Sequence, residues 1–328
     1  MRRQILSHAP RASFLVHLSQ SICVDSASPE NLRLAVLKDA VRLVVYLVGI
    51  VLVGALLGPV LFWMAQWLAG HHIFTSLPKF DFELFFHRAL LVAAVGLLWP
   101  FLRSVRVRTL SDLELKPNPQ RLGDLFAGFI FAELPLLCCG VALIAFHIFS
   151  LRLAISWLAL GKIVAASIVV PVIEELFFRG LILGILLRGG RKYLAIFVTS
   201  ALYSIVHFLK APSRTSATVT WASGFHSIAH ALAQFGDPIL VVAGFTTLFL
   251  IGLVLADARL RTNSLWLPIG LHAGWIFANG VFNKSAHREI VALPWLGKNL
   301  LVGIIPLAIV CLTWAVMRGW LKRGPTKV

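Results

Sequence analysis

Two adjacent glutamates and two histidines are the residues of this chain most able to do chemistry. Glu174 and Glu175 lie in the hydrophobic segment IVVPVIEELFFRGLILGILL, and His207 and His272 lie in two later hydrophobic segments. A carboxylate and an imidazole in a low-dielectric setting can together activate a water molecule, and a second imidazole can stabilise an oxyanion or bind a metal ion. This set of side chains favours peptide-bond hydrolysis as the reaction class.

Helical spacing predicts different roles for the two acids. Residues four apart share a face of an α-helix, so Glu175 and Arg179 are expected to pair. Glu174 is rotated by about 100° and has no partner within its own helix, which leaves it available for chemistry. Pro171 removes one backbone hydrogen bond just before the acids, so we expect a kink there. The alternative is that both acids simply pair with basic residues on other helices.

The two histidines are predicted to reach the same depth as Glu174. Counted at about 1.5 Å per residue from the basic turn at 188–192, Glu174 lies about 21 Å and His207 about 22 Å away. On the same count His272 lies about 16 Å from Arg261, at the next turn on that side. A lone histidine within a membrane helix is more often a hydrogen-bonded core residue than a catalyst. Three helices that bring Glu, His and His to one level nevertheless predict a shared site.

The elements that carry these residues must be membrane helices. Hydrophobic residues make up 59% of the 328 residues and charged residues only 13%, and the mean hydropathy is +0.86. A soluble domain carries about 25% charged residues, and a spanning helix needs about 20 apolar residues in sequence. We therefore expect an all-α, polytopic integral membrane protein with the lipid bilayer as its surroundings.

Eight hydrophobic runs are long enough to be candidate spans. They lie at residues 43–69, 85–102, 125–149, 163–187, 193–209, 239–257, 264–282 and 299–320. Between the fifth and sixth runs, residues 221–235 have apolar side chains at helical spacing and are expected to form a short interfacial helix. The predicted organisation is an N-terminal polar or amphipathic tail (1–38), N-terminal membrane helices (39–160), a catalytic core (163–282), and a last membrane helix with a basic C-terminal tail (283–328).

The strong positive charge is interpreted as a topology signal. The chain has 30 Lys and Arg against 14 Asp and Glu, for a net charge of +16. Most of the basic residues fall in the two tails and the even-numbered connectors, so the positive-inside rule predicts that both termini are cytoplasmic. The expected location is the bacterial cytoplasmic membrane. No nucleic-acid-binding motif accompanies the charge, so no nucleic-acid partner is expected.

Three segments resemble the motifs of the CAAX prenyl protease and bacteriocin-processing (CPBP) family of intramembrane proteases. They are EELFFRG (174–180), YSIVH (203–207) and LPIGLHAGW (267–275), in the order of the family's Glu-Glu-x-x-x-Arg, Phe-x-x-x-His and His-x-x-x-Asn/Asp motifs. The resemblance extends over about residues 163–282. It implies a membrane-embedded endopeptidase that acts on a peptide or a membrane protein.

The resemblance also implies a role for each matched residue. Glu174 and His207 would activate the water. Glu175 and Arg179 would hold the helix in place. His272 would help to bind the oxyanion of the tetrahedral intermediate.

Two positions depart from the family's motifs. Tyr203 stands where the family has Phe, and Ile276 stands where it has Asn or Asp. Asn279 lies three residues after Ile276, almost one helical turn, and about 20° off the face of His272. It is the candidate substitute for the missing Asn or Asp. Loss of one oxyanion donor typically costs about 10²–10³ in rate. Ile276 therefore favours a different function, that of a catalytically impaired immunity or scaffold protein of the same fold.

The same residues could also bind a metal ion or carry a transported proton. No cofactor is favoured, because the sequence lacks a His-Glu-x-x-His motif. If a metal is used, zinc is the candidate, and its ligands would be Glu174, His207 and His272. A proton-coupled transporter could use these side chains as a proton relay, but the sequence shows no inverted repeat of the kind that transporters carry.

Overall fold

The computed structural model describes most of the chain and is almost entirely helical. The described residues are 29–73, 76, 80–115, 118–152, 156–208, 218–290, 293–297 and 299–323. The predicted N-terminal tail up to residue 28 and the end of the predicted basic C-terminal tail, residues 324–328, lie outside them.

The helices and two short strands follow one another along the chain. The α-helices are α2 (Pro29–Gly70), α3 (Phe82–Ser104), α4 (Arg121–Ala145), α5 (Trp157–Glu175), α6 (Leu183–Leu187), α7 (Lys192–Phe208), α8 (Ser223–Ala233), α9 (Pro238–Leu240), α10 (Thr246–Thr262), α11 (Trp266–Ser285) and α12 (Ile304–Arg323). Two π-helical segments are η3 (Leu176–Ile182) and η5 (Val241–Phe245), and two 3-10 turns are η2 (Leu110–Leu113) and η4 (Gln234–Gly236). Strand β1 (Phe149–Leu151) pairs antiparallel with β2 (Ala286–Arg288).

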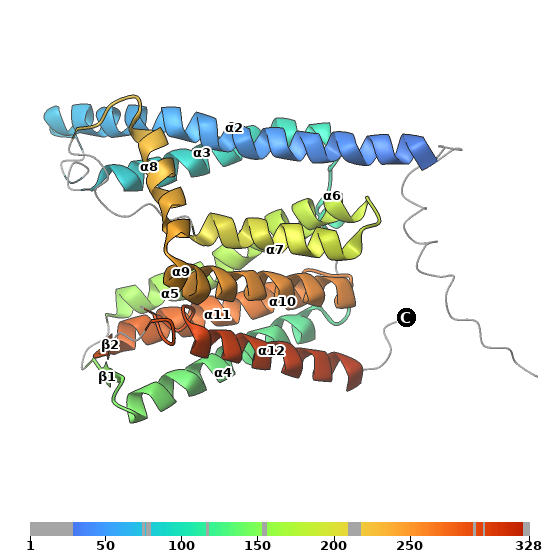
Figure 1. The fold of residues 1–328 in the computed structure, drawn as a ribbon, viewed down its shortest axis with the longest axis vertical. Coiled ribbons are helices and arrows are strands. Elements are labelled where there is room, and N and C mark those ends of the chain that lie inside the picture. Colours follow the sequence, from blue (N-terminus) through green and yellow to red (C-terminus); the bar gives the residue numbers. More distant parts are fainter. Residues whose placement is uncertain are drawn as a thin grey trace, which may run out of the picture.

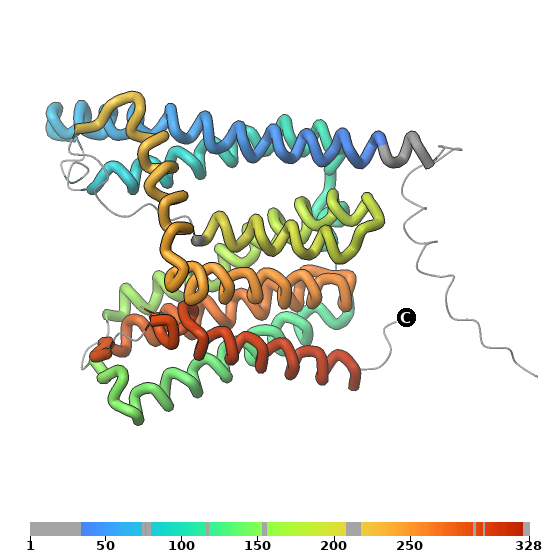
Figure 2. Tube along the Cα trace, in the orientation of Figure 1, coloured from blue at the N-terminus to red at the C-terminus, as the bar shows by residue number. Residues whose placement is uncertain are grey.

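The long helices form two groups, as Figure 1 shows. Helices α2 and α3 pack against each other as one pair, and α4, α5, α7, α10, α11 and α12 form the larger bundle. Helix α8, which lies in the segment predicted to be interfacial, runs across the direction of the long helices (Figure 2). It begins in close contact with α2, because a Cβ on Gly224 would lie 2.1 Å from the carbonyl oxygen of Ala55.

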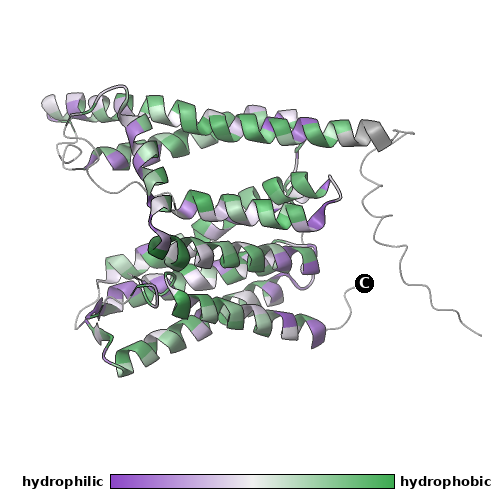
Figure 3. Cartoon of the chain, in the orientation of Figure 1, coloured by the Kyte–Doolittle hydropathy of each residue, from purple (hydrophilic) through white to green (hydrophobic). Residues whose placement is uncertain are grey.

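Five helices in the described part of the chain are long and apolar enough to cross a membrane. They are Leu34–Gly70, Phe82–Ser104, Arg121–Ala145, Pro238–Thr262 and Ile304–Arg323. Hydrophobic residues cover the lengths of these helices, and hydrophilic residues gather near helix ends (Figure 3). An all-α integral membrane protein is thus confirmed, whereas the count of eight spans stays a prediction.

The three predicted spans outside these five are the ones that carry the candidate site. They correspond to α5 with η3 and α6, to α7, and to α11. Helix α7 has only 17 residues. The first of the three is divided into α5, the π-helical segment η3 and α6.

Some predicted boundaries are wrong in detail. Helix α2 begins at Pro29, inside the predicted tail, because proline suits the first turn of a helix and the following residues continue the helix. Helix α12 begins at Ile304 rather than at 299, because Gly303 has φ +128° and donates its N–H to the carbonyl of Ala243. The chain stays α-helical through Pro171 and becomes the π-helical segment η3 at Leu176, and the kink expected at Pro171 stays a prediction.

Two glycines allow α11 to touch the backbone of α4. A Cβ on Gly270 would lie 2.1 Å from the carbonyl oxygen of Leu125, and one on Gly274 would lie 2.4 Å from that of Phe129. Small residues four apart permit this close approach between membrane helices. His272 lies between the two glycines, so the contact fixes the position of the helix that carries it.

Candidate active site

The residues predicted to act together come from three helical segments. Glu174 and Glu175 are the last two residues of α5, and Arg179 follows in η3. His207 lies in the last turn of α7, and His272 lies in the first half of α11. The structure brings all five side chains into one cluster.

Glu174 faces both histidines. Its Oε2 atom lies 3.1 Å from Nε2 of His207 and 3.7 Å from Nε2 of His272. The side chains of Glu174 and His207 are 25% and 23% exposed, whereas that of His272 is only 6% exposed. Glu174 and His207 are therefore the more exposed members of the cluster, although the Oε2 atom of Glu174 is itself buried.

Glu175 forms the buried side of the cluster. Its Oε1 atom accepts a hydrogen bond from Arg179 at 2.9 Å, as the four-residue spacing predicts, and both residues are fully buried. The same oxygen lies 2.8 Å from Nδ1 of His272, a contact between α5 and α11 that the sequence did not predict. Glu175 thus holds the ring of His272 as well as the guanidinium of Arg179.

The partners of the two Nδ1 atoms fix the hydrogens on the imidazole rings. Nδ1 of His207 lies 2.8 Å from the carbonyl oxygen of Tyr203, which can only accept, so this nitrogen carries a hydrogen. Nδ1 of His272 faces the carboxylate of Glu175 and carries a hydrogen for the same reason. In a neutral ring each Nε2 is then an acceptor, and both Nε2 atoms face the carboxylate of Glu174. Three acceptors meet there, so a proton or a donor such as water must lie among them.

Tyr203 supports this arrangement with its ring and its backbone. Its ring centroid lies 4.2 Å from that of His207, and the guanidinium carbon of Arg179 lies 4.4 Å from the same ring. The residue is 3% exposed, and the ring of Phe178 packs edge-on against it. An aromatic side chain four residues before the histidine therefore supports the imidazole and the arginine together. The sequence marked this position only as a Phe replaced by Tyr.

The formal charges of the cluster do not cancel when both imidazoles are neutral. Two carboxylates and one guanidinium leave a net charge of −1 if both imidazoles are neutral. An uncompensated charge is costly away from bulk water. One proton bound among Glu174, His207 and His272 would make the cluster neutral and would be available for acid–base chemistry.

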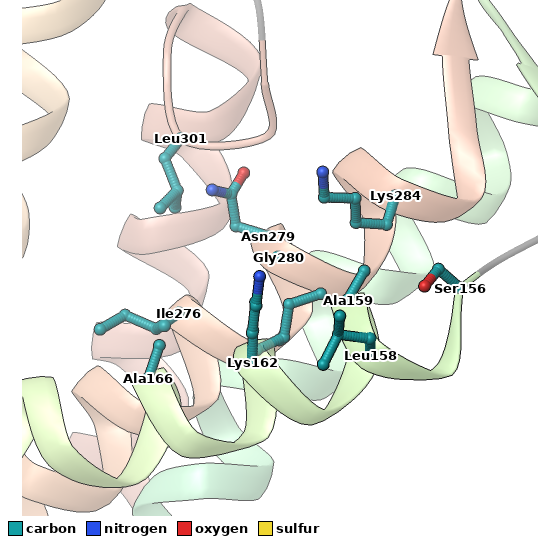
Figure 4. Close-up of a pocket in the computed structure, with 11 residues that line it drawn as sticks. Ser156, Leu158, Ala159, Lys162, Ala166, Ile276, Asn279, Gly280, Lys284 and Leu301 are labelled. Carbon is teal, nitrogen blue, oxygen red and sulfur yellow. The ribbon is translucent and has the colours of Figure 1, made fainter. Parts of the chain in front are cut away.

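Asn279 and Ile276 lie outside the cluster formed by Glu174, Glu175, Arg179, His207 and His272. Both line a separate cavity between α5 and α11 (Figure 4), and no contact within the described residues joins Asn279 to Glu174, His207 or His272. Asn279 follows His272 by seven residues, or about 10 Å of helix. The structure therefore does not bring Asn279 to the cluster, and its predicted use as an oxyanion donor has no geometric support.

Glu174, His207 and His272 are the residues that could hold a zinc ion, because carboxylate and imidazole are common zinc ligands. In the part of the chain that the structure describes, no group of three or more His, Cys, Asp or Glu side chains is arranged to hold a metal ion. The residues do not fit a metal centre in this arrangement, so no catalytic step is derived through one.

Comparison with known proteins identifies the segment that contains this cluster. Residues 155–278 match the family model described as Type II CAAX prenyl endopeptidase Rce1-like. No curated protein and no solved structure matches the chain. The matched segment contains Glu174, Glu175, Arg179, His207 and His272 and ends just before Asn279. Residues 155–278 are therefore similar to CAAX-type membrane proteases, which is consistent with the CPBP family that the three motifs predict.

Proposed function

We propose that the protein is an intramembrane endopeptidase in which Glu174 and His207 activate a water molecule. One observation carries this proposal. Glu174 Oε2 lies within 3.1 Å and 3.7 Å of two imidazole nitrogens, inside a segment that matches a protease family. Three proton acceptors that face one another in the cluster suit the binding and deprotonation of water.

The first half of the proposed reaction uses Glu174, His207 and His272. A water molecule donates one hydrogen bond to Glu174 and one to His207, and its oxygen attacks the carbonyl carbon of the peptide bond. One proton of the water passes to Glu174 as the new C–O bond forms. The carbonyl oxygen becomes an oxyanion, and His272 stabilises it through Nε2–H when it carries the shared proton of the cluster.

The second half returns the proton to the product. The tetrahedral intermediate collapses, the C–N bond breaks, and the proton on Glu174 passes to the leaving nitrogen. The products are a carboxylic acid and an amine, so one water is consumed for each bond cleaved. Glu175 and Arg179 keep their charges throughout and hold His272 and the helix in position.

Cleavage of a peptide library tests this proposal. The purified protein in detergent is mixed with a quenched fluorescent peptide library, alongside Glu174→Ala and His207→Ala variants. We expect loss of about 10²–10⁴ in rate for each variant, which is the usual contribution of a general base. Equal rates for all three proteins would overturn the proposal. A chelator added to the wild type distinguishes this mechanism from zinc catalysis, because only a metal-dependent enzyme loses activity.

The other two functions predict different outcomes. A scaffold or immunity protein that has lost turnover gives no cleavage by any form of the protein. Ile276 at the position of the family's Asn or Asp is the feature that favours it. A transporter gives proton uptake into proteoliposomes that Glu174→Gln abolishes.

We also propose eight spans with both termini on the cytoplasmic side of a bacterial cytoplasmic membrane. The bias of basic residues toward the tails and the even-numbered connectors supports this topology. An even number of spans leaves both ends on one side, whereas five spans would leave them on opposite sides. Reporters fused before residue 1 and after Val328 separate these cases, and an extracytoplasmic readout at either end contradicts the proposal.

A further inference from the structure

A cavity lined by three arginines lies where α3 ends. It has a volume of about 370 Å³, and its lining residues are Arg103, Arg106, Val107 and Arg108. Small-molecule sites in proteins have volumes of about 300–1,000 Å³. Arg103 lies in the last turn of α3, and Arg106 and Arg108 follow within four residues of its end. The cavity therefore gathers three positive charges at one end of a helix that is long and apolar enough to span a membrane.

The three arginines form no ion pair within the part of the chain that the structure describes. Asp112 is close in sequence, but its carboxylate accepts a hydrogen bond from the backbone N–H of Arg108 rather than from the guanidinium. Two other cations, Arg42 and Arg188, share the carboxylate of Asp39. The cavity differs from them, because its positive charges are not compensated by the described residues.

The arginines are not needed to cap the carbonyl groups at the end of α3. Basic side chains near a helix C-terminus often donate to the last carbonyl groups. Here residues 101–103 already accept backbone N–H groups, and Arg42 donates to the carbonyl of Ser104. Arg106 also has φ +60°, a left-handed conformation that favours glycine. A ligand therefore explains the three guanidinium groups better than helix capping does.

An exposed apolar stripe on α3 leads to the cavity. Val95, Trp99 and Arg103 are four residues apart and share one face of the helix. Val95 and Trp99 are exposed, and so is Leu91 one turn earlier. The guanidinium carbon of Arg103 lies 4.3 Å from the centre of the Trp99 ring. From Leu91 to Arg103 the helix extends about 18 Å, slightly more than half of a hydrocarbon core of about 30 Å. The stripe thus has the length of one lipid leaflet and ends at a positive charge.

We propose that the end of α3 binds an anionic phospholipid, with the phosphodiester group in the arginine-lined cavity and an acyl chain along Leu91, Val95 and Trp99. This site is independent of the proposed protease activity. The negatively charged oxygens of a phosphodiester match guanidinium groups, which can each donate two parallel hydrogen bonds. Basic pockets beside membrane helices bind lipid headgroups, and Trp is enriched at the membrane interface. A free phosphate offers the same oxygens but leaves the apolar stripe uncovered, so the stripe favours the lipid.

Lipid titration followed by native mass spectrometry tests the site. The full-length protein in detergent is titrated with phosphatidylglycerol and, separately, with phosphatidylcholine of the same acyl chains, and the first bound lipid gives an apparent Kd. The test variant replaces the three arginines of the cavity (Arg103→Gln, Arg106→Gln and Arg108→Gln). The control variant removes the same charge from three exposed arginines outside the cavity, at the starts of α4 and α7 and the end of α12 (Arg121→Gln, Arg191→Gln and Arg323→Gln). These helix ends lie on the same side of the molecule as the end of α3 (Figure 1).

We expect the wild type and the control to bind phosphatidylglycerol about 10–100-fold more tightly than phosphatidylcholine, because each cation near a membrane surface contributes about fivefold. The cavity variant should bind the two lipids about equally. An equal loss of preference in the control would make the preference an effect of net charge and would overturn the proposal. Equal binding of the two lipids by the wild type overturns it as well.

A single substitution keeps the test decisive if the triple variant does not fold. Arg106→Gly removes one guanidinium and suits the backbone at φ +60°. The temperature of unfolding should stay the same or rise, while phosphatidylglycerol binds about fivefold more weakly. Unchanged affinity for phosphatidylglycerol in the folded Arg106→Gly protein contradicts the proposal.

Two further comparisons distinguish a lipid from a free phosphate. Glycerol phosphate at the same concentration should not displace phosphatidylglycerol, because it does not cover the stripe. Val95→Ser should weaken phosphatidylglycerol binding by about two- to fivefold, whereas Val316→Ser, at an exposed position on α12, should not. Displacement by glycerol phosphate, or equal effects of the two valine substitutions, would make the cavity a phosphate site and would overturn the lipid.

Discussion

Two acidic centres in this molecule use carboxylates in opposite ways. Asp257 on α10 accepts hydrogen bonds from Arg261, Arg318 and Trp314 at 2.7–3.4 Å. Both of its oxygens face permanent donors, two of them guanidinium groups. Glu174 instead faces two imidazole nitrogens at 3.1 Å and 3.7 Å.

The difference separates a structural carboxylate from one that can move a proton. Guanidinium stays charged under all ordinary conditions, so Asp257 is fixed in its ionised form and links α10 to α12. Imidazole gains and loses a proton near neutral pH, so the partners of Glu174 can change their charge during a reaction. The identity of the partner, more than the acid itself, sets what the carboxylate can do.

The largest expected effect comes from the acid-to-amide change at Glu174. The same change at Asp257 is its matched comparison. Glu174→Gln should lower the cleavage rate by about 10²–10⁴, because the amide cannot accept the proton of the water. Asp257→Asn should leave the rate within about threefold, because it removes a link between helices outside the cluster. Peptide cleavage in detergent measures both. A large loss of cleavage rate in Asp257→Asn, or no loss in Glu174→Gln, would contradict the distinction between the two carboxylates.

Substitution of the arginine at each centre compares how much Arg179 and Arg318 contribute to the free energy of unfolding. Arg179→Met leaves Glu175 fully buried beside His272 without its guanidinium, and we expect a loss of about 3–5 kcal/mol in the free energy of unfolding. Arg318→Met acts on a pair whose arginine side chain is 43% exposed, and about 0–1 kcal/mol is expected. Thermal unfolding in detergent gives the order of the two variants. Equal shifts would show that burial does not distinguish the centres.

A glycine substitution tests whether the α4–α11 contact positions His272. In Gly270→Ala the new Cβ would lie 2.1 Å from the carbonyl oxygen of Leu125, so the helices must separate at a cost of about 1–3 kcal/mol. His272 should shift with α11, and cleavage should fall with stability. Gly96→Ala on α3 is the matched control, because a Cβ there meets nothing within 4 Å. Unchanged cleavage by a folded Gly270→Ala protein would contradict the positioning role.

The smallest effects are expected at the two aromatic rings that lie under the arginines. Arg179 lies 4.4 Å from the ring of Tyr203, and Arg318 lies 4.6 Å from that of Trp314. Tyr203→Phe keeps the ring and the backbone carbonyl that holds His207, so cleavage should stay within about threefold. Trp314→Phe removes one donor to Asp257 and should cost about 0.5–1.5 kcal/mol of stability. Strong loss of cleavage in Tyr203→Phe would assign a role to its hydroxyl.

The sequence predicted the parts of the site that follow from local spacing. Glu175 pairs with Arg179 because residues four apart share a helix face, and this holds whatever the rest of the fold does. The common depth of Glu174, His207 and His272 followed from counting residues along helices. Their positions in one cluster agree with that count.

The remaining features depend on how the helices rotate against one another. The contact of Glu175 with His272 joins residues 97 apart, and no periodicity within one helix predicts it. The same limit applies to Asn279, which spacing placed near the face of His272 but which lines the cavity between α5 and α11. The count of eight spans stays a prediction, because five helices of the described residues are long and apolar enough to cross a membrane.

The charged residues within the segment that carries the site have a consequence for how the protein is made. A translocon releases each new segment into lipid according to its own transfer free energy, and ionised side chains at the centre of a segment oppose release. Glu175 and Arg179 lie in the same segment and can neutralise each other before any other helix arrives. Glu174 has no such local partner, so it must wait for α7 and α11 to be synthesised. The pair that takes no part in the proposed chemistry thus eases biosynthesis of the segment that carries it.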